Sequence, residues 1–154
     1  MFNKILVGYD GSPHARKALH VSFDLAKKYG AQITAVSVAH VPDFADTRDE
    51  VNGVMEDAKD FFGKVLEEAK DLAAREGLSL TTRIVPGHPA DTLARLVEEE
   101  GYDLVVLGAR GLSGIKRYLL GSVSEAVVRL ASCPVLIIKG KNKGKGTTNS
   151  TEVY

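Results

Sequence analysis

Apolar and polar residues follow one another in blocks along this chain, and the blocks predict five strands alternating with helices. Three of the predicted strands, residues 5–7, 104–107 and 134–138, are uninterrupted apolar runs. Such runs are typical of strands buried on both faces of a sheet. Residues 32–39 are rich in β-branched side chains and predict another strand. Residues 78–85 alternate apolar with polar positions, so this strand is expected to be half exposed, near an edge.

The first two intervening segments have the 3.6-residue spacing of an amphipathic helix. The first helix is expected to begin with Ser12 as its N-cap and Pro13 at its first position, and to end at Gly30. A second, long helix is expected from about Val54 to Gly77. The polar, irregular residues between these two helices and after the second strand, 41–52, are interpreted as a loop, and the Phe61–Phe62 pair as core packing.

Two further helices complete the pattern. Residues 86–89 predict a turn, and residues 90–100 a helix with an apolar inner face and a solvated Glu-Glu-Glu end. Ser122, with Glu125 three residues later, predicts a capping box at the start of a helix over Val123–Leu130. Strands that alternate with helices in this way indicate an α/β three-layer sandwich built on a parallel sheet.

Composition indicates a single globular domain with a short tail. The 154 residues are 44% hydrophobic and 26% charged, with no net charge. Lys, Gly, Thr, Asn and Ser dominate residues 140–154, which predicts a flexible tail after a domain over residues 1–139. No broad basic face indicates a nucleic-acid partner. The chain contains no long apolar run, so no membrane segment is expected.

The single cysteine, Cys133, excludes an intramolecular disulfide and is consistent with a reducing compartment. It precedes Pro134 at the start of an apolar strand, so it is interpreted as a buried structural thiol. With no secretory or membrane signal, a cytoplasmic location is expected.

The residues most informative about function follow the fourth predicted strand. Gly108, Gly111, Gly121 and Ser122 form the pattern G-x-x-G-(nine residues)-G-[ST]. Glycines allow main-chain N–H groups to approach an anion closely, and a helix N-terminus adds partial positive charge. Residues 109–124 contain three basic residues and no acidic residue. The pattern therefore predicts phosphate binding; the alternative is a plain connecting loop.

This glycine pattern resembles the nucleotide-binding motif of the universal stress protein family. The opening residues 4–12 (KILVGYDGS) and the closing residues 133–138 (CPVLII) resemble that family's first and last strands. The resemblance covers about residues 2–139 and implies an adenine nucleotide alpha hydrolase-like fold with strand order 3-2-1-4-5. That order reverses between the first and fourth strands, where open α/β sheets bind ligands.

The resemblance also implies roles for individual residues. Asp10, after the first strand, would accept hydrogen bonds from ribose hydroxyls; the alternative is an Asx turn that satisfies its own backbone. Gly8 and Tyr9 would line the adenine side, Val38 would bond the adenine edge through its main chain, and Leu107 would pack on the base. The residues expected around the phosphates are Gly108, Arg110, Gly111, Gly121, Ser122, Val123 and Ser124. For Arg110 a solvated side chain is an equal alternative, and any Mg²⁺ would be held mostly by phosphate oxygens and water.

The function expected from these residues is binding of ATP, with ADP or AMP as alternatives, by a homodimeric, nucleotide-dependent regulator of a stress response. The chain lacks the G-x-x-x-x-G-K-[ST] sequence of P-loop ATPases, and its four histidines have no metal-binding spacing. Two alternatives are an interaction module of the same fold without nucleotide and a slow ATP hydrolase. The apolar last strand is expected to be an edge that pairs with a second copy through Val135, Leu136, Ile137 and Ile138. The alternative there is a monomer whose tail covers the edge.

Overall fold

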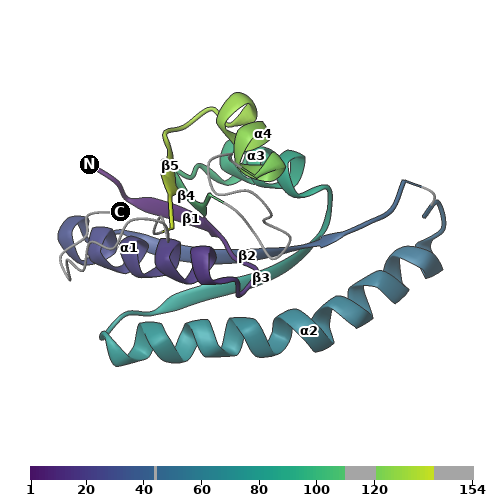
Figure 1. Ribbon diagram of the computed structural model, residues 1–154, viewed down its shortest axis with the longest axis horizontal. Coiled ribbons are helices and arrows are strands. Elements are labelled where there is room, and N and C mark those ends of the chain that lie inside the picture. Colours follow the sequence, from purple (N-terminus) through teal and green to yellow (C-terminus); the bar gives the residue numbers. More distant parts are fainter. Residues whose placement is uncertain (44, 110–120, 141–154) are drawn as a thin grey trace, which may run out of the picture.

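A parallel sheet with helices on both faces forms the body of the protein (Figure 1). The computed structural model describes residues 1–43, 45–109 and 121–140. Within these ranges every helix is too short or too polar to span a bilayer. The elements are, in order, β1 (Lys4–Gly8), α1 (Pro13–Tyr29), β2 (Gln32–His40), α2 (Arg48–Arg75), β3 (Leu80–Gly87), α3 (Pro89–Glu100), β4 (Leu104–Gly108), α4 (Ser122–Leu130) and β5 (Val135–Ile138).

The strand order is β3-β2-β1-β4-β5, and every pair is parallel, so the predicted fold class and strand order are confirmed. β1 lies at the centre of the sheet, and its Val7 pairs with Ala35 of β2 on one side and Val106 of β4 on the other. The strand order reverses between β1 and β4. The carboxyl ends of these two strands therefore lie side by side.

Two apolar layers hold the helices on the sheet. On one face α1 and α2 cover a core that includes Phe23 and Leu19, and on the other α3 and α4 cover a core around Leu96 and Val127 (Figure 1). These four side chains are almost completely buried. The residues of β1 and β4 contribute alternately to the two cores, which explains their uninterrupted apolar sequence.

α1 has the predicted ends. The Ser12 hydroxyl accepts a hydrogen bond from the Ala15 N–H at 3.2 Å, and Pro13 occupies the first turn. Gly30 ends the helix in the left-handed conformation, with φ at 66°. The capping signals in the sequence were therefore sufficient to place this helix.

α2 starts earlier than predicted, and the loop expected over residues 41–52 is wrong in its second half. The helix begins at Arg48, because the Thr47 hydroxyl accepts from the Glu50 N–H at 3.1 Å and two carboxylates occupy the first turn. Thr47 and Glu50 have the spacing of a capping box, which outweighs the polar composition. Phe61 is 52% exposed, so only Phe62 packs against the core and the prediction for Phe61 is wrong.

β3 is an edge strand, as its alternating pattern predicted, but it lies two residues further along the chain and includes Pro86 and Gly87. The Gly87 carbonyl accepts from the Val41 N–H on the β2 side, so the neighbouring Pro86 faces away from the sheet. A proline is tolerated there because no partner strand needs its missing N–H.

At the other edge, Cys133 before β5 is half-buried rather than buried, and burial raises the pKa of its thiol. The thiol therefore stays protonated at neutral pH, as expected of a structural cysteine.

Candidate functional site

The exits of β1 and β4 define the candidate site. Val7 of β1 pairs with Val106 of β4. Asp10 follows β1 and Ala109 follows β4, both at the carboxyl ends of these parallel strands. The structure therefore places Asp10 on the same side of the molecule as Gly108, at the single reversal of strand order. In open α/β sheets, ligands bind outside the carboxyl ends of the strands at such a reversal.

The Asp10 carboxylate takes part in the turn that starts α1. Its Oδ1 atom accepts from the Ser12 N–H at 2.9 Å, so the Asx turn considered from the sequence is present. An ionised carboxylate has room for several hydrogen bonds on its two oxygens. The turn therefore orients Asp10 and is compatible with a contact to a ligand.

The main chain of Tyr9 lies at the exit of β1, and its side chain packs in the core. The ring is 3% exposed and belongs to the core beneath α1 and α2. Burial raises the pKa of the phenol, against the opposing effect of a hydrogen bond with Arg16. The Tyr9 N–H donates to the Val36 carbonyl at 2.9 Å, which continues the pairing of β1 with β2.

The two glycines that end β1 and β4 are required by packing. A Cβ atom on Gly8 would collide with the Leu107 side chain, which is itself 4% exposed. A Cβ atom on Gly108 would lie 2.7 Å from the carbonyl carbon of His14 and 2.9 Å from the Ala15 nitrogen. The close approach of α1 to the exit of β4 thus explains Gly108 without any ligand.

α4 begins beside this exit, one residue earlier than predicted. Gly121 rather than Ser122 is the N-cap, and the Ser122 side chain makes no capping hydrogen bond, so the predicted capping box is wrong. The Gly121 N–H donates to the Ala109 carbonyl at 2.6 Å, and its own carbonyl accepts from the Glu125 N–H at 3.0 Å. The first of these bonds holds Gly121 extended, which leaves Ser122 as the first helical residue.

The first turn of α4 contains main-chain N–H groups beside the exit of β4. Ser122, Val123 and Ser124 occupy its first three positions, where main-chain N–H groups have no partner within a helix. The Ser124 side chain is 4% exposed, and its hydroxyl donates to the Gly108 carbonyl at 2.9 Å. Ser124 thus ties the N-terminus of α4 to the exit of β4. A helix N-terminus in this position favours an anion.

Two of the predicted phosphate contacts, Arg110 and Gly111, lie outside the described residues. Of the remaining predicted site residues, Val38 is half-buried near the carboxyl end of β2, beside Tyr9. The structure therefore brings the predicted residues of β1, β2, β4 and α4 to the carboxyl ends of the central strands.

Sequence reasoning missed Ser37. Its side chain is 1% exposed, and its hydroxyl donates to the Tyr9 carbonyl at 2.6 Å. The signal was a polar residue within the apolar part of β2, between Val36 and Val38. Sequence alone did not show which main-chain group this hydroxyl bonds.

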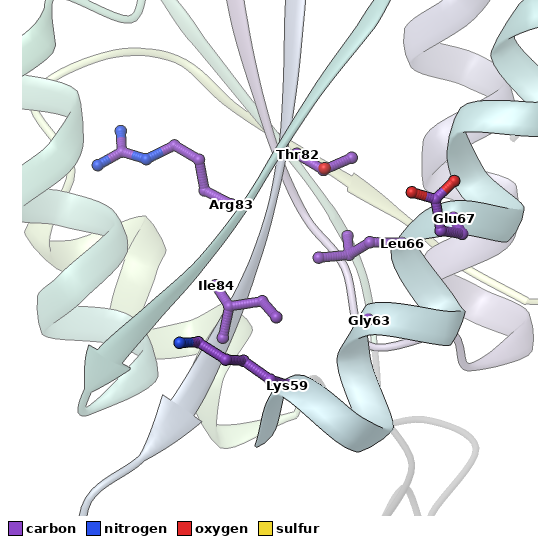
Figure 2. A pocket seen from close by; sticks show the side chains of 7 residues that line it. All are labelled: Lys59, Gly63, Leu66, Glu67, Thr82, Arg83 and Ile84. Atoms are coloured by element: carbon purple, nitrogen blue, oxygen red, sulfur yellow. The ribbon is translucent and has the colours of Figure 1, made fainter. Parts of the chain in front are cut away.

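An open groove of about 310 Å³ lies elsewhere, between α2 and the edge strand β3 (Figure 2). Figure 2 shows the Arg83 side chain pointing away from α2, and its guanidinium donates to both oxygens of Glu100 at 2.8 and 2.6 Å. No predicted site residue lines the groove, whose lining residues are Lys59, Gly63, Leu66, Glu67, Thr82, Arg83 and Ile84. Nor do the described residues contain a group of three or more His, Cys, Asp or Glu side chains suited to a metal ion.

Comparison with known proteins gives consistent matches. The model of the universal stress protein family matches residues 1–139. The universal stress protein YxiE of Bacillus subtilis is 36% identical over 150 residues, which cover 90% of this chain and all of that protein. Among solved structures, hypothetical protein MJ0577 is similar with a TM-score of 0.80 and 27% identity, covering 93% of this chain and 99% of that one. A universal stress protein in complex with cAMP has a TM-score of 0.69 and 28% identity, covering 89% and 97%.

Proposed function

Because the chain belongs to the universal stress protein family, whose model matches residues 1–139, we propose that it binds an adenine nucleotide, with ATP as the expected ligand. One observation supports this most directly: Asp10 after β1 and the N-terminus of α4 after β4 flank the reversal of strand order. A relative 28% identical to this chain has been solved with cAMP, which also contains adenine, ribose and phosphate.

In this proposal each part of the nucleotide meets a different element. Asp10 accepts hydrogen bonds from the ribose, the main chain of Val38 bonds the adenine edge, and Leu107 with Gly8 supports the base. The first-turn N–H groups of α4 bond the phosphates, since the partial positive charge of a helix N-terminus favours anions. Arg110 and Gly111 belong to the phosphate-binding residues of the same proposal. Mg²⁺ would be held mainly by phosphate oxygens and water.

The proposed role is regulation rather than turnover. A cytoplasmic, homodimeric regulator whose state depends on the bound nucleotide needs a binding site and a partner surface. β5 offers such a surface, because it is an edge strand whose Val135, Leu136 and Ile137 are only half-buried. An apolar edge of this kind is closed by pairing with a second copy. Sedimentation of the purified protein is expected to give the mass of a dimer.

A second candidate function, an interaction module that needs no nucleotide, is favoured by two contacts. Gly108 is explained by the close approach of α1, and the Gly121 N–H is bonded to the Ala109 carbonyl. These two glycines therefore have structural reasons to be present. The proposed phosphate contacts consequently rest on the N–H groups of Ser122, Val123 and Ser124.

Ser122 allows a sharp test of these N–H groups. Proline is well accepted at the first position of a helix, and the backbone of the preceding Gly121, with φ −64° and ψ 154°, is compatible with a following proline. Ser122→Pro removes one N–H and a hydroxyl, whereas the control Ser122→Ala removes only the hydroxyl. We expect Ser122→Pro to bind ATP about tenfold more weakly than Ser122→Ala in calorimetric titration, because one hydrogen bond to a charged phosphate is lost.

The wild-type protein must also bind ATP for the proposal to stand. Mass spectrometry after gentle denaturation is expected to find an adenine nucleotide that has co-purified with it. Equal affinity of the proline and alanine variants would contradict the assignment of the phosphate site to α4. Absence of any ATP binding by the wild type would favour the interaction module instead.

A further inference from the structure

The hydrogen bonding between β1 and β2 changes where β1 ends. Gly8 is the register partner of Val36, so Tyr9 lies opposite Ser37. In a parallel ladder a residue in this position bonds to both neighbours of its partner. The Tyr9 N–H should therefore donate to the Val36 carbonyl, and the Tyr9 carbonyl should accept from the Val38 N–H. The first bond is present, at 2.9 Å.

The second bond is replaced by a side chain. The Tyr9 carbonyl accepts from the Ser37 hydroxyl at 2.6 Å, and among the described residues no hydrogen bond joins the Val38 N–H to this carbonyl. Ser37 is 1% exposed and Tyr9 is 3% exposed, so neither the Ser37 hydroxyl nor the Tyr9 carbonyl is accessible to bulk water. A buried carbonyl without a donor is costly, and the Ser37 hydroxyl removes that cost.

This replacement changes what Val38 can do. The Val36 carbonyl faces β1, and main-chain groups two residues apart on a strand point the same way, so the Val38 N–H and carbonyl face the exit of β1 as well. Adenine presents an acceptor at N1 beside a donor at its 6-amino group, and one residue's N–H and carbonyl match that pair.

We propose that Ser37 is a positioning residue that sets the base specificity of the nucleotide site: by bonding the Tyr9 carbonyl it leaves the Val38 N–H for the adenine edge. This inference rests on the proposed nucleotide binding. It assigns adenine recognition to a side chain that makes no contact with the base.

The test compares ATP with ITP, which differs from ATP only in the base. In ITP the N1 atom bears a hydrogen and cannot accept from the Val38 N–H, and a carbonyl oxygen replaces the 6-amino group that would donate to the Val38 carbonyl. We expect the wild type to prefer ATP by about a hundredfold, the effect of two hydrogen bonds. In Ser37→Ala the Tyr9 carbonyl is expected to take the Val38 N–H. The variant should then lose the part of this preference that comes from N1, about tenfold, with its affinity for ITP almost unchanged.

Two controls separate this role from simple loosening of the fold. Ser22 of α1 is also completely buried, and its hydroxyl donates to the Ala18 carbonyl at 2.8 Å, so Ser22→Ala removes a similar bond away from the strand exits. It should keep the ATP preference of the wild type. Ser37→Thr retains the hydroxyl and should keep that preference too.

Hydrogen exchange in the wild type provides a measurement that needs no variant. The Val38 amide should exchange rapidly without ligand and become protected when ATP is added. Slow exchange in the ligand-free protein would overturn the inference. An unchanged ATP preference in Ser37→Ala, or an equal loss of ATP and ITP binding, would overturn it as well. A wild type that binds neither nucleotide contradicts the proposed function itself, whereas ATP binding with unchanged preference contradicts only the role of Ser37.

Discussion

Two aspartates lie at opposite ends of the central strand pair β1–β4, and their surroundings differ. Asp103 precedes β4 at the amino end, and its carboxylate accepts from the N–H groups of Asn3 and Lys4 at 2.8 and 3.1 Å. Asp10 follows β1 at the carboxyl end, and its carboxylate accepts from the Ser12 N–H at 2.9 Å. Both carboxylates therefore bond main-chain N–H groups, so the bonds alone do not distinguish a structural aspartate from a ligand-binding one.

The neighbouring groups make the distinction. At the amino end Lys4 donates to the Glu100 carbonyl at 2.6 Å, and its ammonium group lies 4.6 Å from the centre of the Tyr102 ring. Charged groups there are paired within the fold. At the carboxyl end Asp10 stands across the strand exits from the first turn of α4, whose N–H groups have no partner within the helix. The comparison indicates that the amino end of the sheet fastens the strands, whereas the carboxyl end is where the proposed function needs a ligand.

The largest expected effect concerns a residue that does not fit this division. Gly108 lies at the ligand end, but a Cβ atom there would lie 2.7–2.9 Å from main-chain atoms of His14 and Ala15. Backbone cannot move as easily as a side chain, so we expect Gly108→Ala to lower the free energy of unfolding by about 3 kcal/mol in urea denaturation. A matched control is Gly63→Ala in α2, where a Cβ atom meets nothing within 4 Å. It should stabilise the protein by up to about 1 kcal/mol. Equal effects of the two variants would show that α1 does not constrain Gly108.

The two aspartates themselves give the next largest effects, and the effects should appear in different measurements. Asp103→Ala removes the acceptor of two main-chain N–H groups, so the free energy of unfolding should fall by about 2 kcal/mol while ATP affinity stays constant. Asp10→Asn keeps an oxygen for the Ser12 N–H but replaces the other carboxylate oxygen by a donor. Its ATP affinity should fall about tenfold with little change in stability. Loss of ATP affinity in Asp103→Ala, without unfolding, would contradict the division between the two ends.

Much of the fold was predictable because its signals are local. Ser12, Pro13 and Gly30 fixed both ends of α1, and the uninterrupted apolar runs identified the buried strands. Errors arose where two local signals competed. Polar composition concealed the Thr47–Glu50 capping box, and Ser122 was predicted as an N-cap although Gly121, bonded to Ala109, is the cap.

The candidate site was predictable as a set of positions, but not in its bonding. The strand order that the family resemblance implied, together with the switch-point rule, placed Asp10 and Gly108 at neighbouring strand exits. Sequence reasoning gave Gly108 a role in phosphate binding that packing against α1 explains equally well. It also missed Ser37, because the bond from its hydroxyl to the Tyr9 carbonyl depends on the register of β1 with β2. Contacts between residues far apart in the sequence follow only from the three-dimensional structure.

The smallest expected effect is a pH dependence of stability that comes from the ion pair between Arg83 and Glu100. The hydrogen bonds from Arg83 lower the pKa of the Glu100 carboxyl below its ordinary value of 4.5. A carboxyl whose pKa is lower in the folded state stabilises the protein above its unfolded pKa, and this contribution is lost as the pH falls through the folded pKa. The free energy of unfolding should therefore decrease below about pH 4.5, and less steeply in Arg83→Gln. Since both side chains are about one-third exposed, the difference should stay below about 1 kcal/mol.

Arg95→Gln, which breaks the exposed pair with Glu99 on the same helix, is the matched control and should retain the wild-type pH dependence. ATP affinity at pH 7 should be the same in all three proteins, because the hydrogen bonds of Arg83 and Glu100 involve none of the proposed nucleotide-binding residues. A weaker affinity in Arg83→Gln alone would connect this ion pair with the proposed site.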